Sequence, residues 1–180
     1  MVVMKNDITK RPIGSRALFN FVGCAVSIAV MALLALATRS PFVFPSLGPT
    51  AFLFFSTPNS AAASPRNTII GHAIGTVTGY LSLVVTGLTT AGPIILVGVS
   101  WQRVIAASLS LGITGGLMIL LRVTHPPAGA TTLIISLGIL TTPFQLGILM
   151  LAVIILTILA IIIHRLAHIS YPLWSAASDK

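Results

Sequence analysis

Long apolar stretches alternate along this chain with short breaks that contain proline or polar residues. Four stretches of about twenty residues contain no Asp, Glu, Lys or Arg: residues 17–36, 68–88, 104–121 and 144–163. A helix of that length crosses the roughly 30 Å hydrocarbon core of a bilayer. The pattern therefore predicts four membrane-spanning helices, the first of which is too long for the apolar part of a secretory signal. The last stretch is the most uniformly apolar, and we expect it to be the most exposed to lipid.

Two further apolar segments are too short to cross a bilayer as helices, and each begins at a proline break. The first, residues 47–57, starts within the break at residues 45–50, and the second, residues 128–140, follows the break at residues 124–127. Proline removes a backbone donor and blocks the preceding helical turn, so neither segment can continue the span before it. Broken backbone at membrane depth is tolerated only inside protein or along a cavity. Residues 94–99 form a third short segment, which a following tryptophan and arginine mark as interfacial.

The two short segments occupy corresponding places in two halves of the chain. A shift of 81 positions brings together three pairs of residues: Pro45 with Pro126, Gly48 with Gly129, and Thr50 with Thr131. Each half also has the same order of a long span, a proline break, a short apolar segment and a second long span. We therefore predict an all-α membrane protein with an internal repeat, in which residues 17–88 and 103–166 form the two halves. Paired interrupted segments of this kind are typical of transporter binding sites.

The basic residues predict how the chain is oriented in the membrane. If the short segments are re-entrant, the chain crosses four times and seven basic residues lie on the cytoplasmic side with both termini, against three outside: Arg39, Arg66 and Arg122. This arrangement fits the positive-inside rule better than full crossing by every short segment, which gives six against four and places the C-terminus outside. In both arrangements the two halves have the same orientation. The predicted organisation is a basic cytoplasmic tail (residues 1–16), one transmembrane domain (17–166) and an interfacial tail (167–180), in the cell membrane.

Composition and charge narrow the class of ligand. Hydrophobic residues make up 56% of the chain and charged residues 7%, with a mean hydropathy of +1.05, which is typical of a protein mostly surrounded by lipid. The net charge of +8 comes from scattered Lys and Arg, so we do not expect a nucleic acid as partner. The only acids, Asp7 and Asp179, lie near the termini. This excludes a carboxylate metal site or proton relay in the apolar body and favours an anion as the ligand.

Other classes of chemistry have no matching motif. The sequence contains no phosphate-binding loop with lysine, no pairing of a nucleophile and base with a carboxylate, and no cysteine cluster, since Cys24 is the only cysteine. We therefore predict that the chain is not an enzyme and holds no cofactor and no metal.

Several segments together resemble one family of small integral membrane proteins. The segment at residues 124–131, Thr-His-Pro-Pro-Ala-Gly-Ala-Thr, is similar to the motif for which the HPP family is named, and residues 45–50 and 65–72 add to the resemblance. The resemblance covers residues 17–165 and implies four membrane spans. It also implies a substrate, because some members of the family, from cyanobacteria and the chloroplast envelope, are linked to nitrite transport.

The two breaks carry the candidate binding site. Proline favours the first turn of a helix, and the first N–H groups of a helix have no partner within it. Two short helices starting at the breaks would aim free N–H groups and positive dipole ends at one anion. The residues predicted to bind it are Gly48, Pro49, Thr50, His125, Pro126, Pro127, Gly129 and Thr131. Behind these we place Asn67 and His72, and at the mouth Arg39, Arg66 and Arg122, whose charge would raise the local anion concentration.

Structural interpretations of the same residues stay open. Pro126 and Pro127 could form a tight turn outside the membrane, and His125 could bond freed carbonyl groups rather than the substrate. Gly71, Gly75 and Gly79 recur at every fourth position, a spacing that suits close helix packing or an oligomer interface. His72, beside this stripe, is predicted to be an interhelical hydrogen-bonding residue, and His164 and His168 are predicted to lie at the membrane interface.

The leading functional prediction is a transporter or channel for a small inorganic anion, with nitrite as the preferred candidate. The apolar body is thin around a polar site, which favours a homo-oligomer in the lipid bilayer. One alternative is a structural or assembly subunit without a pore. Another is a redox protein with haem between His72 and a C-terminal histidine.

Overall fold

The structure, a computed structural model, describes residues 7–176, which form helices and connecting loops. The long helices are α1 (Ile13–Thr38), α3 (Pro65–Val85), α5 (Trp101–Leu120) and α7 (Pro143–Leu166), and the half-length helices are α2 (Leu47–Ser56) and α6 (Pro127–Ser136). Single turns are α4 (Ile94–Val97), η1 (Ile8–Lys10) and η2 (Ala61–Ala63). The four long helices are long and apolar enough to cross a membrane, so the prediction of four spans and two shorter helices is confirmed.

Local sequence signals explain where these helices begin. Pro65, Pro127 and Pro143 each stand at the first position of a helix, where a missing N–H costs no hydrogen bond. Ser64 and Thr142 cap two of these helices, because each side chain accepts a bond from the N–H three residues further on. The prolines that interrupt the apolar pattern therefore start the next helices, and the predicted helix bounds hold to within about one turn.

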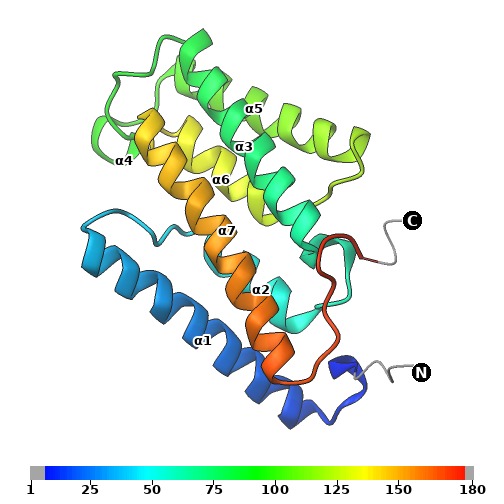
Figure 1. Cartoon of the computed structure of the whole chain (residues 1–180). Helices are drawn as coiled ribbons and strands as arrows, with labels where there is room; N and C mark the ends of the chain where they lie inside the picture. The colour runs from blue at the N-terminus through cyan, green and yellow to red at the C-terminus, as the bar shows by residue number, and fades with distance from the viewer. Residues whose placement is uncertain (1–6, 177–180) are drawn as a thin grey trace.

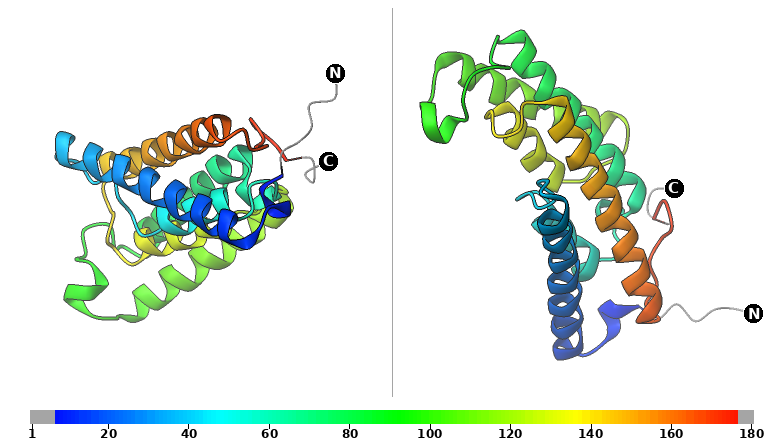
Figure 2. Two further views of the ribbon diagram at one scale, coloured as in Figure 1. Left: turned by 90° about the horizontal axis from the view of Figure 1, so that it is seen from below. Right: turned by 60° about the vertical axis from the view of Figure 1, so that its left-hand side comes forward.

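One end of the molecule, here named the tail end, holds the beginning of α1, the end of α2, the beginning of α3 and the end of α7. Asp7, before α1, accepts a hydrogen bond from the amide of Asn59, after α2. The N–H of Arg66, at the start of α3, donates to the carbonyl of Trp174, after α7. Figures 1 and 2 show the first and last described segments of the chain at this end.

The opposite end, here named the far end, holds α4, the beginning of α5 and the end of α6. The guanidinium of Arg103 donates to the carbonyls of Ser136 and Gly92, and the N–H of Ile94 donates to the carbonyl of Leu137. The chain therefore runs from the tail end to the far end in α1, α3 and α6, and in the reverse direction in α2, α5 and α7 (Figure 1).

The two halves, α1–α3 and α5–α7, consequently have opposite orientations. The prediction that they share one orientation is wrong. Each half-length helix covers only about 15 Å along its axis, but the extended segments beside it complete the passage to the other end. With its flanking segment, α2 therefore carries the chain from the far end to the tail end, and α6 carries it from the tail end to the far end. A re-entrant segment would instead have brought the chain back to the end at which the preceding long helix finished.

This topology changes the predicted distribution of positive charge. Arg66 and Arg122 lie together at the tail end, since the guanidinium of Arg66 donates to the carbonyl of Arg122 over 3.0 Å. Arg39 and Arg103 lie at the far end. The sequence-based assignment of Arg66 and Arg122 to the side opposite the N-terminus, and of Arg103 to the same side, is wrong. Lys5 and Lys180, which entered that assignment, are outside the described residues.

The repeat is visible in the backbone as well as in the order of elements. Arg39 follows α1 with a φ of 52°, and Arg122 follows α5 with a φ of 53°. A left-handed conformation is uncommon for residues other than glycine. Its presence after the first helix of each half indicates that the chain ends that helix with the same backbone conformation in both halves.

Packing across the halves is reciprocal. Each half-length helix contacts the last helix of the other half: α6 lies on α3, and α2 lies on α7. The last helices, α3 and α7, contact each other, and the first helices, α1 and α5, lie at the two edges (Figure 1). The junction of α2, α3 and α6 is therefore the interior of the molecule.

The glycine stripe of α3 makes the closest of these contacts possible. A Cβ atom on Gly75 would lie 2.7 Å from the carbonyl oxygen of Ala128, and one on Gly79 would lie 2.9 Å from that of Thr132. Both carbonyls belong to α6, so the stripe is used for packing within the chain. Only glycine lets the α3 and α6 backbones approach this closely.

The edge position of α1 makes it the most exposed span. Only 17% of its apolar stretch is buried, against 39% for α7. The expectation that α7 would be the most exposed to lipid is therefore wrong. Uniform hydrophobicity in α7 reflects its central position, where α1, α2 and α3 all pack against it.

Candidate functional site

The N-terminal turns of the two half-length helices meet at one histidine. Thr50 in α2 places its Oγ1 3.0 Å from Nε2 of His72, and Thr131 in α6 places its Oγ1 2.8 Å from Nδ1 of the same ring. All three side chains are fully buried. Thr50 and Thr131 are the residues that the internal repeat pairs, so one imidazole from α3 joins equivalent points of the two halves.

This meeting point lies between the two ends of the molecule. From Thr50, α2 leads to the tail end, and from Thr131, α6 leads to the far end. The two helices thus run apart from a shared centre, with both N-termini directed inward. Each N-terminus carries a partial positive charge, so the centre is a region of positive potential without any cationic side chain among its hydrogen-bonded residues.

His125 forms the other side of the junction. Its Nδ1 lies 2.6 Å from the carbonyl oxygen of Ala62. A carbonyl only accepts, so Nδ1 carries the hydrogen, and in the neutral ring Nε2 is the acceptor, 3.3 Å from Oγ1 of Thr50. The centroids of the His72 and His125 rings are 4.9 Å apart. His125 therefore ties the loop before α6 to α2 and to the turn before α3.

A cavity of about 560 Å³ that is widely open to the outside lies beside this junction, between the first turns of the half-length helices. Its lining is almost entirely apolar and consists of Pro49, Phe52, Leu53, Pro126, Pro127 and Ala130. Pro126 also borders a second cavity of about 390 Å³ that reaches Gly129 and α5. Four of the predicted site residues, Pro49, Pro126, Pro127 and Gly129, thus line cavities, while Thr50, His125 and Thr131 lie buried behind them.

Free backbone donors are scarce at this point. The N–H groups of Ala128 and Gly129 donate to the carbonyls of His125 and Pro126, and the two prolines have no N–H. The start of α6 therefore lacks the predicted free N–H donors. It can act on an anion in the cavity only through the positive end of the helix dipole. Gly48 is exposed, and a Cβ atom there would meet nothing within 4 Å.

The predicted arginine vestibule is divided between the two ends. Arg66 and Arg122 are together at the tail end, and Asn67 joins them by accepting from Arg66 over 3.2 Å and donating to the carbonyl of Thr124 over 3.4 Å. Arg39 is at the far end. The cluster of Arg66, Asn67 and Arg122 lies next to the proline break at residues 124–127. Arg39, in contrast, directly follows α1 at the far end.

Comparison with known proteins identifies the family. The model of the HPP transmembrane region matches residues 9–172. The chain belongs to the HPP family. It is 32% identical over 127 residues to a transmembrane protein of Dictyostelium discoideum, covering 71% of this chain and 41% of that protein. It is 30% identical over 122 residues to a second transmembrane protein of the same organism, covering 68% of this chain and 36% of that protein.

These comparisons support a multi-pass membrane protein. The HPP chain spans less than half the length of the curated relatives it matches. No solved structure matches it.

A second polar cluster in the HPP domain was not predicted from the sequence. Thr114 in α5 hydrogen-bonds to Thr78 in α3 and, over 2.9 Å, to Thr132 in α6. These side chains are buried and hold α3, α5 and α6 together. Isolated threonines in apolar spans do not by themselves predict a polar cluster. The one available clue was Thr132, which directly follows Thr131 and so lies on a neighbouring face of the same short helix.

His164 lies in the last turn of α7, enclosed by aromatic side chains. Its ring is fully buried and stacks on Phe55 and Tyr171, with centroid distances of 5.3 and 4.4 Å. The C-terminal segment folds back over α7 and encloses His164 within the protein, while its position at the depth of the membrane interface stays a prediction. A haem shared by His72 and this histidine does not fit the HPP chain, since both ring nitrogens of His72 are hydrogen-bonded to threonines.

Proposed function

We propose that this HPP-family chain is a transporter of a small monovalent inorganic anion, with nitrite as the preferred substrate. The observation that supports the proposal is the meeting of two oppositely directed half-length helices at their N-terminal turns. In transporters built from inverted repeats, substrates bind near the bilayer midplane where such interrupted helices meet. Nitrite is preferred because members of the family have been linked to its transport.

The apolar lining of the cavity favours an anion that sheds water easily. Two helix N-termini each contribute roughly half a positive charge, but Pro49, Pro126 and Pro127 offer no N–H donors. An anion entering this cavity exchanges much of its hydration for a dipole field. Because the cost of removing water rises steeply with charge, nitrite is favoured over sulfate or phosphate.

In this proposal the buried histidines position the helices and do not contact the substrate. His72 holds the first turns of α2 and α6 on opposite sides of one ring, and His125 fixes the loop before α6. Rocking of one half against the other about this junction would open the cavity to each side in turn. The chain transports the anion unchanged and is not an enzyme.

The charge distribution supports an orientation with the tail end in the cytoplasm. Among residues 7–176, the basic residues at the tail end are Lys10, Arg11, Arg16, Arg66, Arg122 and Arg165, and those at the far end are Arg39 and Arg103. An excess of this size follows the positive-inside rule. We place the protein in the cell membrane with a cytoplasmic N-terminus.

A second small-residue stripe supports a homo-oligomer. Gly112 and Gly116 in α5 are exposed, and a Cβ atom on either would meet nothing within 4 Å. Ser108 continues the stripe one turn earlier. Because the glycine stripe of α3 is already used inside the chain, the stripe of α5 is the face we propose for contact with a second copy.

The proposal is tested by anion flux into liposomes that contain the purified protein. We expect nitrite to accumulate above the level of protein-free vesicles, unchanged in chemical form, and sulfate to stay outside. Ala130→Leu narrows the cavity, and a steric penalty of about 1.4 kcal/mol on the bound anion corresponds to a roughly tenfold loss in nitrite flux. Runs with and without a pH gradient determine whether protons are coupled to the anion.

Ala29→Leu is the matched control, because Ala29 is an exposed alanine of α1 away from the cavity. We expect it to transport like the unmodified protein. Equal nitrite flux through the Ala130 and Ala29 variants would show that the anion does not pass through this cavity. An absence of flux for nitrite, nitrate and chloride in the unmodified protein would favour the pore-less structural subunit instead.

A further inference from the structure

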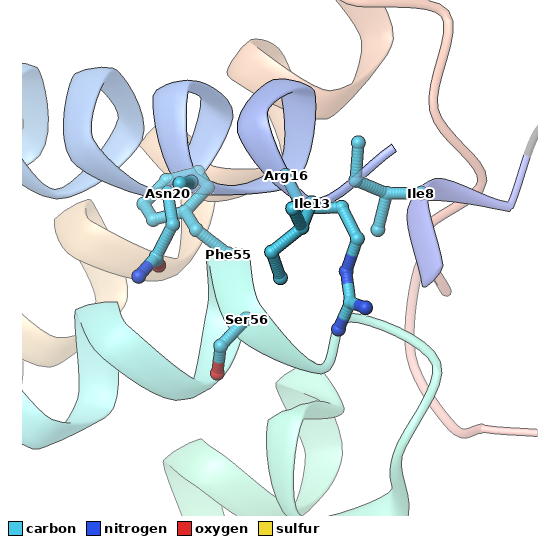
Figure 3. Close-up of a pocket in the computed structure, with 7 residues that line it drawn as sticks. Ile8, Ile13, Arg16, Asn20, Phe55 and Ser56 are labelled. Carbon is cyan, nitrogen blue, oxygen red and sulfur yellow. The ribbon is translucent and has the colours of Figure 1, made fainter. Parts of the chain in front are cut away.

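A separate cavity lies at the tail end, in the cleft between the first turns of α1 and the end of α2. It has a volume of about 150 Å³ and is partly open to the outside. Its lining combines three polar side chains with four apolar ones: Arg16, Asn20 and Ser56 with Ile8, Ile13, Ala17 and Phe55. In Figure 3 the side chains of Arg16 and Asn20 extend from α1 toward α2, which carries Ser56.

The charge of Arg16 is not balanced by any acid in the described part of the chain. Asp7 is the one carboxylate within residues 7–176, and its Oδ1 accepts bonds from the N–H and hydroxyl of Thr9 and from the side-chain amide of Asn59. The bonds from the backbone N–H and hydroxyl of Thr9 lower the pKa of Asp7, so this carboxylate is ionised but engaged elsewhere. A half-buried guanidinium beside two uncharged hydrogen-bonding groups is suited to an anion from outside the chain.

The apolar wall of the cavity includes a buried ring and lies near an exposed apolar face of α1. Phe55 is buried, and its ring stacks parallel to that of His164 with an interplanar angle of 3°. On the same helix as Arg16, Leu18 and Phe21 are 63% and 71% exposed and face outward. The site therefore offers an anion-binding group at the level of the membrane surface, next to apolar side chains that contact acyl chains.

We propose that this cavity binds a phosphate group, and that its source is the headgroup of an anionic phospholipid of the leaflet at the tail end. A guanidinium matches the geometry of phosphate oxygens with two parallel N–H donors. Basic cavities between membrane helices are known to accept lipid headgroups on the cytoplasmic side. The bound lipid would hold α1, the most exposed span, against α2.

The test measures lipid retention by the full-length protein in detergent micelles. Native mass spectrometry and thermal unfolding are recorded with phosphatidylglycerol, with phosphatidylcholine and with inorganic phosphate alone. We expect phosphatidylglycerol to be retained and to raise the unfolding temperature more than phosphatidylcholine does. Arg16→Gln should weaken that binding roughly tenfold, as expected for the loss of a charge-assisted hydrogen bond.

Arg165→Gln is the matched control, because it removes the same charge from an exposed position at the tail end. We expect it to bind phosphatidylglycerol like the unmodified protein. Arg16→Lys keeps the charge but loses the paired donors, so its binding should be intermediate even if Arg16→Gln folds poorly. A response to inorganic phosphate that equals the lipid response and also depends on Arg16 would assign the site to free phosphate.

Two results would overturn the proposal. One is an equal loss of binding in the Arg16→Gln and Arg165→Gln variants, which would mean that only the overall surface charge matters. The other is the absence of any preference for phosphatidylglycerol over phosphatidylcholine together with no response to phosphate. Neither measurement depends on transport, so a failure here leaves the proposed anion transport untouched.

Discussion

Two threonines that match across the internal repeat lie on opposite sides of one imidazole ring. Thr50 and Thr131 reach Nε2 and Nδ1 of His72, and each comes from the first turns of a different half-length helix. A buried hydroxyl without a partner costs about 1–3 kcal/mol, so this ring stabilises a point at which α2 and α6 share a hydrogen-bonding group. At the scale of single residues, His72 is therefore the link between the two halves.

A double-mutant cycle tests this link. His72→Leu and Thr131→Val should each destabilise the protein by about 1–3 kcal/mol, because each leaves a buried polar group without its partner. The double variant should lose clearly less than the sum, since both changes break the same bond. The free energy of unfolding is measured by denaturant titration in mixed micelles. Additive losses would show that the two side chains are not coupled.

At the scale of elements, two helices carry small-residue stripes and only one stripe is used inside the chain. The glycines of α3 pack against the carbonyls of α6, whereas those of α5 face outward. The spacing of four residues is the same in both helices. The difference comes from position, because α3 is central and α5 is at an edge.

Substitution of one glycine from each stripe separates these roles. Gly75→Leu should destabilise the fold by about 3 kcal/mol or prevent stable insertion, since the new side chain meets the backbone of α6. Gly112→Leu should leave the unfolding temperature nearly unchanged but shift the protein toward monomers. Both are compared by thermal unfolding and by light scattering in detergent. Normal folding of the Gly75 variant would contradict the close packing, and an unchanged oligomer with Gly112→Leu would contradict the proposed interface.

At the scale of the whole molecule, the two halves are inverted relative to each other. The half-length helices reverse the chain, so the loop after α2 lies at the tail end with the N-terminal segment, and the start of α5 lies at the far end. This inversion is what directs both helix N-termini to the centre. Two halves in the same orientation would direct both short helices toward the same end.

Accessibility of single cysteines tests the inversion. In a Cys24→Ala background, Ser15→Cys and Asn59→Cys should react with a membrane-impermeant thiol reagent from the same side, and Gln102→Cys from the opposite side. All three positions are exposed. The four-crossing arrangement with re-entrant segments predicts instead that Asn59 reacts from the side opposite Ser15, and that Gln102 reacts from the same side as Ser15.

Much of the architecture was predictable because it depends on local properties of the chain. Apolar length gave the four spans, and the prolines at positions 65, 127 and 143 gave the starts of three helices. The pairing of Thr50 with Thr131 could also be found from the repeat alone. The cavity at Pro49, Pro126 and Pro127 lies at the predicted breaks, although the role of its residues in binding an anion stays a prediction.

The sequence by itself determined that this is an all-α membrane protein with two related broken segments, since hydropathy and proline act on a few neighbouring residues at a time. Only the tertiary structure decided the direction of α2 and α6, because a short apolar segment has the same composition whether it crosses or returns. It also decided that His72 lies between the two halves, that His164 is buried, and that Arg66 and Arg122 lie together while Arg39 is apart. Such contacts join residues far apart in the chain, and their energies exist only once the helices have packed.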